Sequence, residues 1–305
     1  MPWQIVRLRR RLKELYLQIN PDIVVSTPRI EKWIVASLKG GWSKVIEYHA
    51  TKHFRVMKAD SPGKRIMAHI SDFFNYEINA NCFDRVVVST YEDKDMNWKS
   101  NDRVVVIPNP SSIQPLRGSP LEDRRVIAIG RLVKEKNFTS LIRAFAYVAN
   151  RFPDWKLDIL GEGYDRQSLE SQIARLSLEN NVFLRGTQTN LSDWLLKSSI
   201  FVMTSHCEGL PLVLLEAINY GLPVVTYAFS CGPKDVITDG QNGFLVPECD
   251  EKALAYHVCQ LIEDKELRKR MGAAAFERAK DFSIEKIMSM WMCLFKELAS
   301  RNSSA

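Results

Sequence analysis

Short runs of β-branched residues alternate with longer amphipathic stretches along the whole chain, a pattern typical of parallel sheets covered by helices. In the first third, this alternation predicts helices over about 3–19, 30–39 and 64–80, and strands over about 23–26, 44–47, 85–88 and 104–107. It restarts with strands over about 125–130, 156–160, 182–185, 200–203, 223–226 and 243–246. We therefore predict an α/β fold with two Rossmann-like, doubly wound domains.

The two halves are separated by a segment rich in turn-forming residues, Pro108 to Pro120, which predicts a linker. We expect a partial first domain over 1–115, a second domain over 121–282, and a closing helix over 283–305 that returns toward the first domain. The closing helix carries an apolar stripe of Met288, Trp291, Met292 and Phe295, typical of a core-facing surface. Because the chain opens with a helix and about 107 residues precede the linker, we expect the first domain to be truncated.

Composition narrows the class of protein. Of 305 residues, 46% are hydrophobic and 26% are charged, which is typical of a globular chain and excludes a disordered regulator. The longest apolar runs are far shorter than the ~18 residues that span a bilayer. Six cysteines without a CxxC pair or a zinc-site spacing indicate neither a disulfide framework nor a metal site. No signal peptide is visible, so we expect a cytoplasmic protein.

The net charge of +6 is concentrated toward the N-terminal third. The basic cluster Arg7–Lys13 shares a predicted helix with Ile5, Leu8 and Leu12 at helical spacing. Two interpretations stay open: a solvated helix face, or a surface that binds anionic lipid headgroups at the membrane. The sequence contains no recognisable DNA- or RNA-binding motif, so we expect no nucleic-acid partner.

The candidate chemistry lies in the second half. The strand at 125–130 leads into a loop with Gly130, Arg131 and Lys136. In open α/β sheets this position faces the ligand crevice. The Arg131 guanidinium can bind phosphate oxygens and Lys136 can place a compact charge beside them, so the pair could neutralise a diphosphate in place of a metal. The alternative is two ordinary exposed loop cations.

Two carboxylates follow the strand at 200–203. Pro211 suits the first turn of a helix, so we expect Glu208 in the preceding loop and Glu216 inside the helix, beside Leu215. Backbone amides of Gly209, Leu210 and Leu212 at the helix start would attract an anion. Glu216 is flanked by apolar residues, and a buried carboxylate there needs hydrogen-bond donors, which a pair of ribose hydroxyls would supply. We also expect Leu215 among the donor-binding residues.

Two further turns follow strands in this half. Leu160-Gly161-Glu162-Gly163 is most simply a structural turn. Phe183-Leu184-Arg185-Gly186 ends another strand, and backbone groups around Arg185 could contact a nucleobase. These motifs together resemble the donor-binding half of the family 4 (group 1) retaining glycosyltransferases, which have two Rossmann-like domains facing a cleft. The resemblance runs from Gly130-Arg131 through Glu208 and Glu216 to Asn242-Gly243-Phe244, in the family's order and spacing.

The resemblance implies transfer of a hexose from a UDP- or GDP-linked sugar to a hydroxyl of a glycan or lipid-linked acceptor, in polysaccharide or glycolipid assembly, without a metal or other cofactor. It implies that Arg131 and Lys136 hold the diphosphate, that Glu208 contacts the hexose, and that Glu216 binds the ribose. One departure is Leu210-Pro211, where many relatives have a second glycine. Since Pro211 lacks an amide hydrogen, one phosphate contact is expected to be absent or shifted.

The first domain resembles the acceptor half less closely. His49 follows a strand, and we expect it either to relay the acceptor's proton or to be a structural histidine. Two alternative functions remain open: a nucleotide-sugar epimerase of the same architecture, and a non-catalytic nucleotide-sugar-binding subunit.

Overall fold

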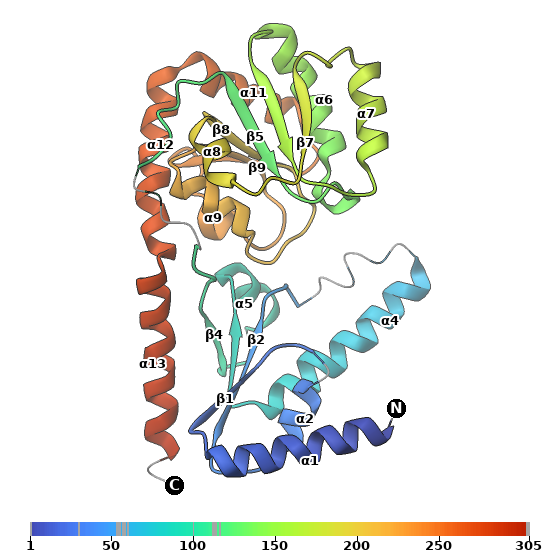
Figure 1. Ribbon diagram of the computed structural model, residues 1–305, viewed down its shortest axis with the longest axis vertical. Coiled ribbons are helices and arrows are strands. Elements are labelled where there is room, and N and C mark those ends of the chain that lie inside the picture. The colour runs from blue at the N-terminus through green and yellow to red at the C-terminus, as the bar shows by residue number, and fades with distance from the viewer. Residues whose placement is uncertain are drawn as a thin grey trace. The chain divides into compact units, whose positions relative to one another are not determined.

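The computed structural model describes residues 2–302 apart from 30, 53–55, 57, 58, 60, 100, 112–114 and 116. The chain forms two compact units, one comprising Met1–Pro108 with Ile287–Ala305 and the other Asn109–Lys286 (Figure 1). Positions 112–114 and 116 of the predicted linker lie outside the described residues. Each unit is built around a parallel β-sheet of its own.

The first unit contains a four-stranded parallel sheet whose strands lie in chain order. Its elements are α1 (Pro2–Ile19), β1 (Ile23–Ser26), α2 (Glu31–Ser37), β2 (Ser43–Tyr48), α4 (Pro62–Asp72), the π-helix η1 (Phe73–Asn79), the 3₁₀-helix η2 (Ala80–Cys82), β3 (Arg85–Val88), α5 (Tyr91–Asn97), β4 (Val104–Val106) and α13 (Ile284–Asn302).

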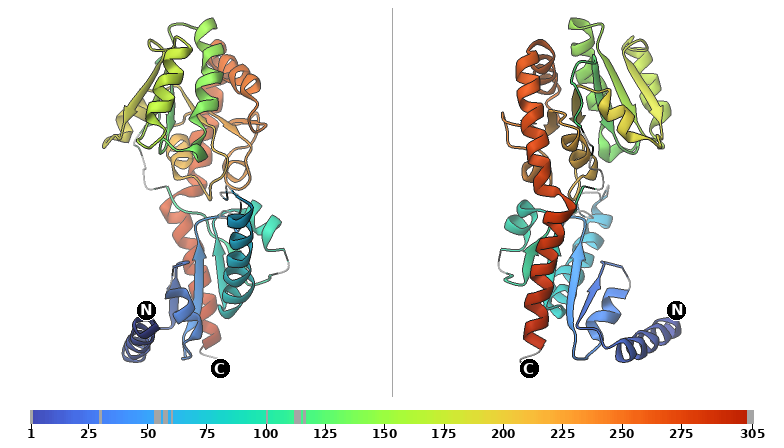
Figure 2. Two further views of the ribbon diagram at one scale, coloured as in Figure 1. Left: turned by 90° about the vertical axis from the view of Figure 1, so that its right-hand side faces the viewer. Right: turned by 60° about the vertical axis from the view of Figure 1, so that its left-hand side comes forward.

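Both faces of this sheet are covered, as expected for parallel strands. On one face Val45 and Val87 pack against Ile287, Leu294 and Leu298 of α13, which runs along the sheet (Figure 2). The stripe chosen from the sequence is therefore partly wrong, because Met288 and Met292 remain 47% and 49% exposed. The sequence has two overlapping apolar stripes on this helix, and only the neighbouring strands decide which one is buried.

Two helical elements of this unit differ from expectation. The predicted helix over 64–80 is α4 followed by a π-helix and a 3₁₀ turn. The sequence analysis did not predict the helix α5, because its composition is mostly charged and polar and it lacks a clear apolar period. Its start is capped by Thr90, whose side chain accepts a hydrogen bond from the Asp93 amide.

The second unit contains a six-stranded parallel sheet in the order β10-β9-β8-β5-β6-β7, which is doubly wound. Its elements are β5 (Arg125–Ile129), the 3₁₀-helix η3 (Lys134–Lys136), α6 (Phe138–Arg151), β6 (Lys156–Leu160), α7 (Arg166–Arg175), β7 (Val182–Gly186), α8 (Leu191–Leu196), β8 (Ile200–Met203), α9 (Leu212–Asn219), β9 (Val224–Tyr227), α10 (Pro233–Val236), β10 (Gly243–Val246), α11 (Glu251–Glu263), α12 (Lys265–Ala279) and the 3₁₀-helix η4 (Lys280–Phe282).

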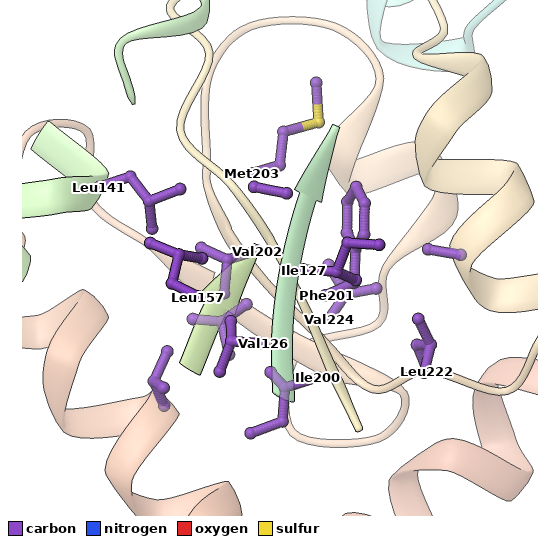
Figure 3. Close-up of a cluster of buried hydrophobic side chains, with 14 of the residues drawn as sticks. Val126, Ile127, Leu141, Leu157, Ile200, Phe201, Val202, Met203, Leu222 and Val224 are labelled. Carbon is purple, nitrogen blue, oxygen red and sulfur yellow. The ribbon is translucent and has the colours of Figure 1, made fainter. Parts of the chain in front are cut away.

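One large hydrophobic core holds the second unit together. The central strands β8 and β9 are buried along their whole length, which explains their unbroken apolar sequences. Figure 3 shows how Val126, Ile127, Leu157 and Phe201 gather around the middle of the sheet. Their packing fixes the strands, and so fixes the starting points of the loops at the carboxyl ends.

The prediction of an α/β fold with two parallel sheets is confirmed. The doubly wound order applies to the second sheet, whereas the four described strands of the first follow one another across the sheet. Within the described part of the chain, no helix combines the length and the apolar character that crossing a membrane would require.

Because one face of α13 packs on the first sheet, shortening a side chain on that face should destabilise the unit more than shortening one on the exposed face. Leu298→Ala should destabilise the first unit by about 2 to 5 kcal/mol, because it leaves a cavity at a fully buried position. Met292→Ala on the same helix is the matched control and should cost less than about 1 kcal/mol. Hydrogen exchange measured by mass spectrometry should accelerate in β2 and β3 of the first variant only. Unchanged exchange there in Leu298→Ala would contradict the packing.

Candidate functional site

The strand order of the second sheet defines where a ligand can bind. The chain proceeds from β5 outward through β6 and β7, then returns to β8 on the other side of β5 and proceeds through β9 and β10. Ligands of open α/β sheets bind outside the carboxyl ends of the strands at such a switch point. The loops after β5 and β8 are therefore the candidate site.

The loop after β5 is held against the loop after β6 by close backbone contacts. The Gly130 amide donates to the Leu160 carbonyl at 2.9 Å, and the Leu132 amide donates to the Glu162 carbonyl at 2.9 Å. Gly161 adopts a φ of +135°, and a Cβ added there would lie 1.9 Å from the Gly130 oxygen. Only glycine fits this approach, so Gly161 is a structural residue, as its turn sequence indicated.

Lys136 and Glu208 join the loops after β5 and β8. The Lys136 Nζ donates to Glu208 Oε1 at 2.5 Å, and the two side chains are 17% and 19% exposed. A Cβ added to Gly130 would lie 3.2 Å from the Lys136 stem, so the glycine leaves room for the lysine to reach across. The structure therefore brings three of the predicted residues, Gly130, Lys136 and Glu208, into one place.

Backbone contacts reinforce this junction. The Thr204 hydroxyl shares its one hydrogen between the carbonyls of Lys136 and Asn137, at 3.1 Å from each oxygen, and the His206 amide donates to the Glu135 carbonyl at 2.9 Å. Thr204 is 1% exposed, so these bonds are shielded from water. The sequence analysis missed Thr204, although a lone hydroxyl directly after a buried strand is a usable signal for such a contact.

The start of α9 presents free donors beside Glu208. In the part of the chain that the structure describes, the amides of Gly209, Leu210 and Leu212 donate no hydrogen bond. Free amides at a helix start form a binding site for an anion. The helix begins at Leu212, so Pro211 is the N-cap, and not the first residue of the helix as its position in the sequence suggested. The Pro211 carbonyl accepts a hydrogen bond from the Leu214 amide at 3.0 Å.

Glu216 lies in the second turn of α9 and is half-buried. Desolvation by burial raises the pKa of its carboxyl above the usual 4.5. Among the described residues, none donates a hydrogen bond to this carboxylate. A carboxylate that is desolvated and has no donor is suited to accept hydrogen bonds from a ligand.

Arg131 and Leu215, two further predicted residues of this unit, differ from each other in exposure. Arg131 follows Gly130 and is exposed, and it forms no ion pair with any residue described by the structure. Leu215 is fully buried in the core, which corrects its assignment to donor binding, because its side chain presents no accessible surface. Its position next to Glu216 in the sequence does not place it on the same face of the helix.

Arg185 is engaged on the face of the sheet. Its Nε donates to Asp158 Oδ1 at 2.6 Å, and Arg125 Nη1 donates to Asp158 Oδ2 at 2.6 Å. The guanidinium lies over the rings of Phe183 and Trp194, at 4.3 and 5.5 Å from their centroids. The Arg185 side chain is thus engaged within the sheet, and the contact of backbone groups around Arg185 with a nucleobase stays a prediction. A lone aspartate in the apolar strand 156–160 was the signal for this network.

His49 belongs to the first unit. It follows β2, its side chain is 50% exposed, and its Nδ1 lies 3.7 Å from Glu47 Oε1. An accessible imidazole beside a carboxylate has the chemistry of a proton acceptor. Within the described ranges, no three side chains among His, Cys, Asp and Glu come together as a metal site would require.

Comparison with known proteins finds similarity along most of the chain. The model of the family described as "Glycosyl transferases group 1" matches residues 113–278. An uncharacterized glycosyltransferase of Methanocaldococcus jannaschii is 34% identical, over 97% of this chain and 84% of its own length. An uncharacterized glycosyltransferase of Haemophilus influenzae is 30% identical over 68% of this chain.

A solved structure extends the similarity. A mutant of TarM from S. aureus, in complex with fondaparinux, alpha-GlcNAc-glycerol and UDP, superposes with a TM-score of 0.71 at 26% identity over 83% of this chain. This chain covers 51% of that protein and 60% of the H. influenzae relative. It is thus shorter than several proteins that it resembles.

The environment of Glu216 predicts a dependence of stability on pH. Because the folded state raises the pKa of its carboxyl, folding favours the neutral form, and stability falls as pH rises through the folded pKa above 4.5. Glu216→Gln removes this penalty, so its Tm should exceed that of the parent at pH 7, and the difference should vanish near pH 4. Glu179→Gln, at an exposed position, is the control and should show no such trend. A Tm that is lower than the parent's at pH 7 would contradict this account.

Proposed function

The chain belongs to the glycosyl transferases group 1, and from this membership we propose that it transfers a hexose from a nucleotide-diphosphate sugar to a hydroxyl of a glycan or lipid-linked acceptor. The observation that carries the proposal is the contact of Lys136 with Glu208 at the switch point of the second sheet, beside the free amides at the start of α9. This combination offers positive charge and donors for a diphosphate next to a carboxylate for a sugar.

We propose a role for each group in the reaction. The bond between the anomeric carbon and the diphosphate oxygen breaks, and negative charge develops on the departing nucleotide. Arg131, Lys136 and the amides of Gly209 and Leu210 stabilise that charge, which requires no bound metal. An ammonium group has three donors, so Lys136 can contact Glu208 and a phosphate oxygen at once.

The carboxylates are proposed to bind the two ends of the donor. Glu208, fixed by Lys136, accepts hydrogen bonds from the hexose and orients it for attack by the acceptor hydroxyl with retention at the anomeric carbon. Glu216 accepts hydrogen bonds from the ribose hydroxyls, which compensates the desolvation that raises its pKa. His49 remains the proposed proton acceptor on the acceptor side. UDP, which is bound in the similar S. aureus structure, is the first donor nucleotide to test.

Removal of the diphosphate contact should impair turnover selectively. Lys136→Ala should lower kcat by about 10² to 10³, the usual effect of one lost donor to the developing charge. Lys134→Ala removes an exposed cation two residues away and is the matched control, with activity expected within about twofold. Nucleotide release is measured with a panel of UDP- and GDP-sugars, with and without a lipid-linked acceptor. Full activity of Lys136→Ala, or formation of a new nucleotide-sugar without nucleotide release, would overturn the proposal.

We further propose that the first unit binds an anionic membrane surface, where a lipid-linked acceptor would be located. The helix α1 exposes Trp3 at 77% and Val6 at 65%, together with exposed Arg7 and Arg11. The helix α4 and the π-helix η1 that follows it expose an apolar face of large side chains, while polar residues of the same two elements are buried. That face comprises Ile66, Met67, Ile70, Phe73 and Phe74. Exposed apolar faces flanked by basic residues are suited to an anionic bilayer.

Vesicle sedimentation tests this surface. Each basic residue near an anionic surface contributes about 1 kcal/mol, so Arg7→Ala with Arg11→Ala should weaken binding to phosphatidylglycerol vesicles by roughly thirtyfold. Lys252→Ala with Arg270→Ala removes the same charge from exposed positions of the second unit and should leave binding unchanged. If both pairs of substitutions weakened vesicle binding equally, the net charge of the chain and not the surface of α1 would be responsible for the binding.

A further inference from the structure

The first unit contains a cavity with no assigned role. Its volume is about 410 Å³, within the range of small-molecule sites. It lies between the turn after β1, the start of α2 and the end of α4 with the π-helix, elements that are neighbours in Figure 1. The residues that line it are Pro28, Arg29, Lys32, Trp33, Ser71, Phe74 and Asn75.

Hydrogen bonds hold the walls of this cavity in place. The Tyr48 hydroxyl donates to the Asn75 carbonyl at 3.1 Å, and Asn75 Nδ2 donates to Ser71 Oγ at 3.0 Å. In the turn after β1, the Arg29 amide donates to the Thr27 carbonyl at 2.8 Å. Asn75 belongs to the π-helix, a distortion that occurs frequently at functional sites. The cavity is therefore preformed.

The charged side chains that line the cavity are all basic. Arg29 and Lys32 contribute two cations, and none of the lining residues is a carboxylate. Lys32 is only 4% exposed and has another interaction within the protein, but an ammonium group can serve several acceptors. Arg29 is exposed, and its guanidinium can bind phosphate oxygens in a bidentate manner. Ser71 and Asn75 add neutral polar groups. The lining is complementary to a small anion such as a phosphoryl group.

The remaining lining residues are Pro28 and two aromatic residues. Trp33 and Phe74 are 41% and 49% exposed and border the same space as the cations. Aromatic faces beside a few polar groups typically contact the less polar surface of an organic ligand. An inorganic anion would leave these walls unused. The complete lining therefore fits a phosphoryl group attached to a sugar or polyol.

We propose that this cavity binds the phosphoryl group of a phosphate-bearing acceptor, with Arg29 and Lys32 on the phosphate and with Trp33 and Phe74 against the attached sugar or polyol. The inference rests on the proposed function, because it names the class of acceptor for that transfer. It shares Phe74 with the membrane surface above but differs from that surface in its charged groups, because Arg29 and Lys32 belong to the cavity alone.

Direct binding without a nucleotide-sugar tests the site separately from transfer. Glucose 1-phosphate and glycerol 3-phosphate are titrated calorimetrically into the full chain, with glucose, glycerol and inorganic phosphate as reference ligands. We expect both phosphate esters to bind more tightly than any reference ligand. Arg29→Ala should weaken this binding by about tenfold, the effect of one charge-assisted hydrogen bond. Lys39→Ala removes an exposed cation beyond α2 and is the matched control, with unchanged binding.

Hydrogen exchange locates the ligand independently of any variant that might unfold. Residues 71–75 should gain protection on addition of glucose 1-phosphate in the parent and not in Arg29→Ala. Equal affinity of Arg29→Ala and the parent, no binding at millimolar ester, or inorganic phosphate binding as tightly as the esters would overturn the proposal. It would also be overturned if phosphatidylglycerol vesicles alone protected residues 31–33, a segment that contributes Lys32 and Trp33 to the cavity and lies outside the proposed membrane surface, because a lipid headgroup would then be the source of the phosphate. Loss of transfer activity with intact ester binding would instead count against the proposed function.

Discussion

The contact between Lys136 and Glu208 is the interaction on which the candidate site depends. It joins two loops that are 72 residues apart in sequence and shields both charges to less than one-fifth exposure. A partly buried ion pair requires good geometry, which the bonds of Thr204 to the neighbouring backbone provide. Without this framework of backbone hydrogen bonds, Lys136 and Glu208 would be exposed, and nothing would hold their side chains together.

The framework in turn depends on the doubly wound order of the second sheet. Because β5 and β8 are neighbours, the loops that follow them begin side by side at the same edge. Gly130 and Gly161 allow the loops after β5 and β6 to approach at backbone distance. The buried core of the sheet thus supplies the rigidity, and the glycines supply the close approach that places charged groups at the switch point.

Much of the fold and part of the site could be predicted from the sequence. Strand positions followed from apolar runs, because parallel strands are buried on both faces. The loop positions of Lys136 and Glu208 followed from the strand ends. The side-chain directions of Arg185 and Leu215 could not be predicted in this way, since the structure directs one to Asp158 and the other into the core. Sequence distance does not report the direction of a side chain.

The sequence by itself determined the alternation of strands and helices, the kinds of charged groups at strand ends, and the family of the chain. These features depend on local periodicity and on residue type. Only the tertiary structure decided which charges meet, which stripe of α13 is buried, and that Arg29 and Lys32 share a cavity with Ser71 and Asn75. Those outcomes depend on contacts between segments far apart in the chain, which local patterns do not encode.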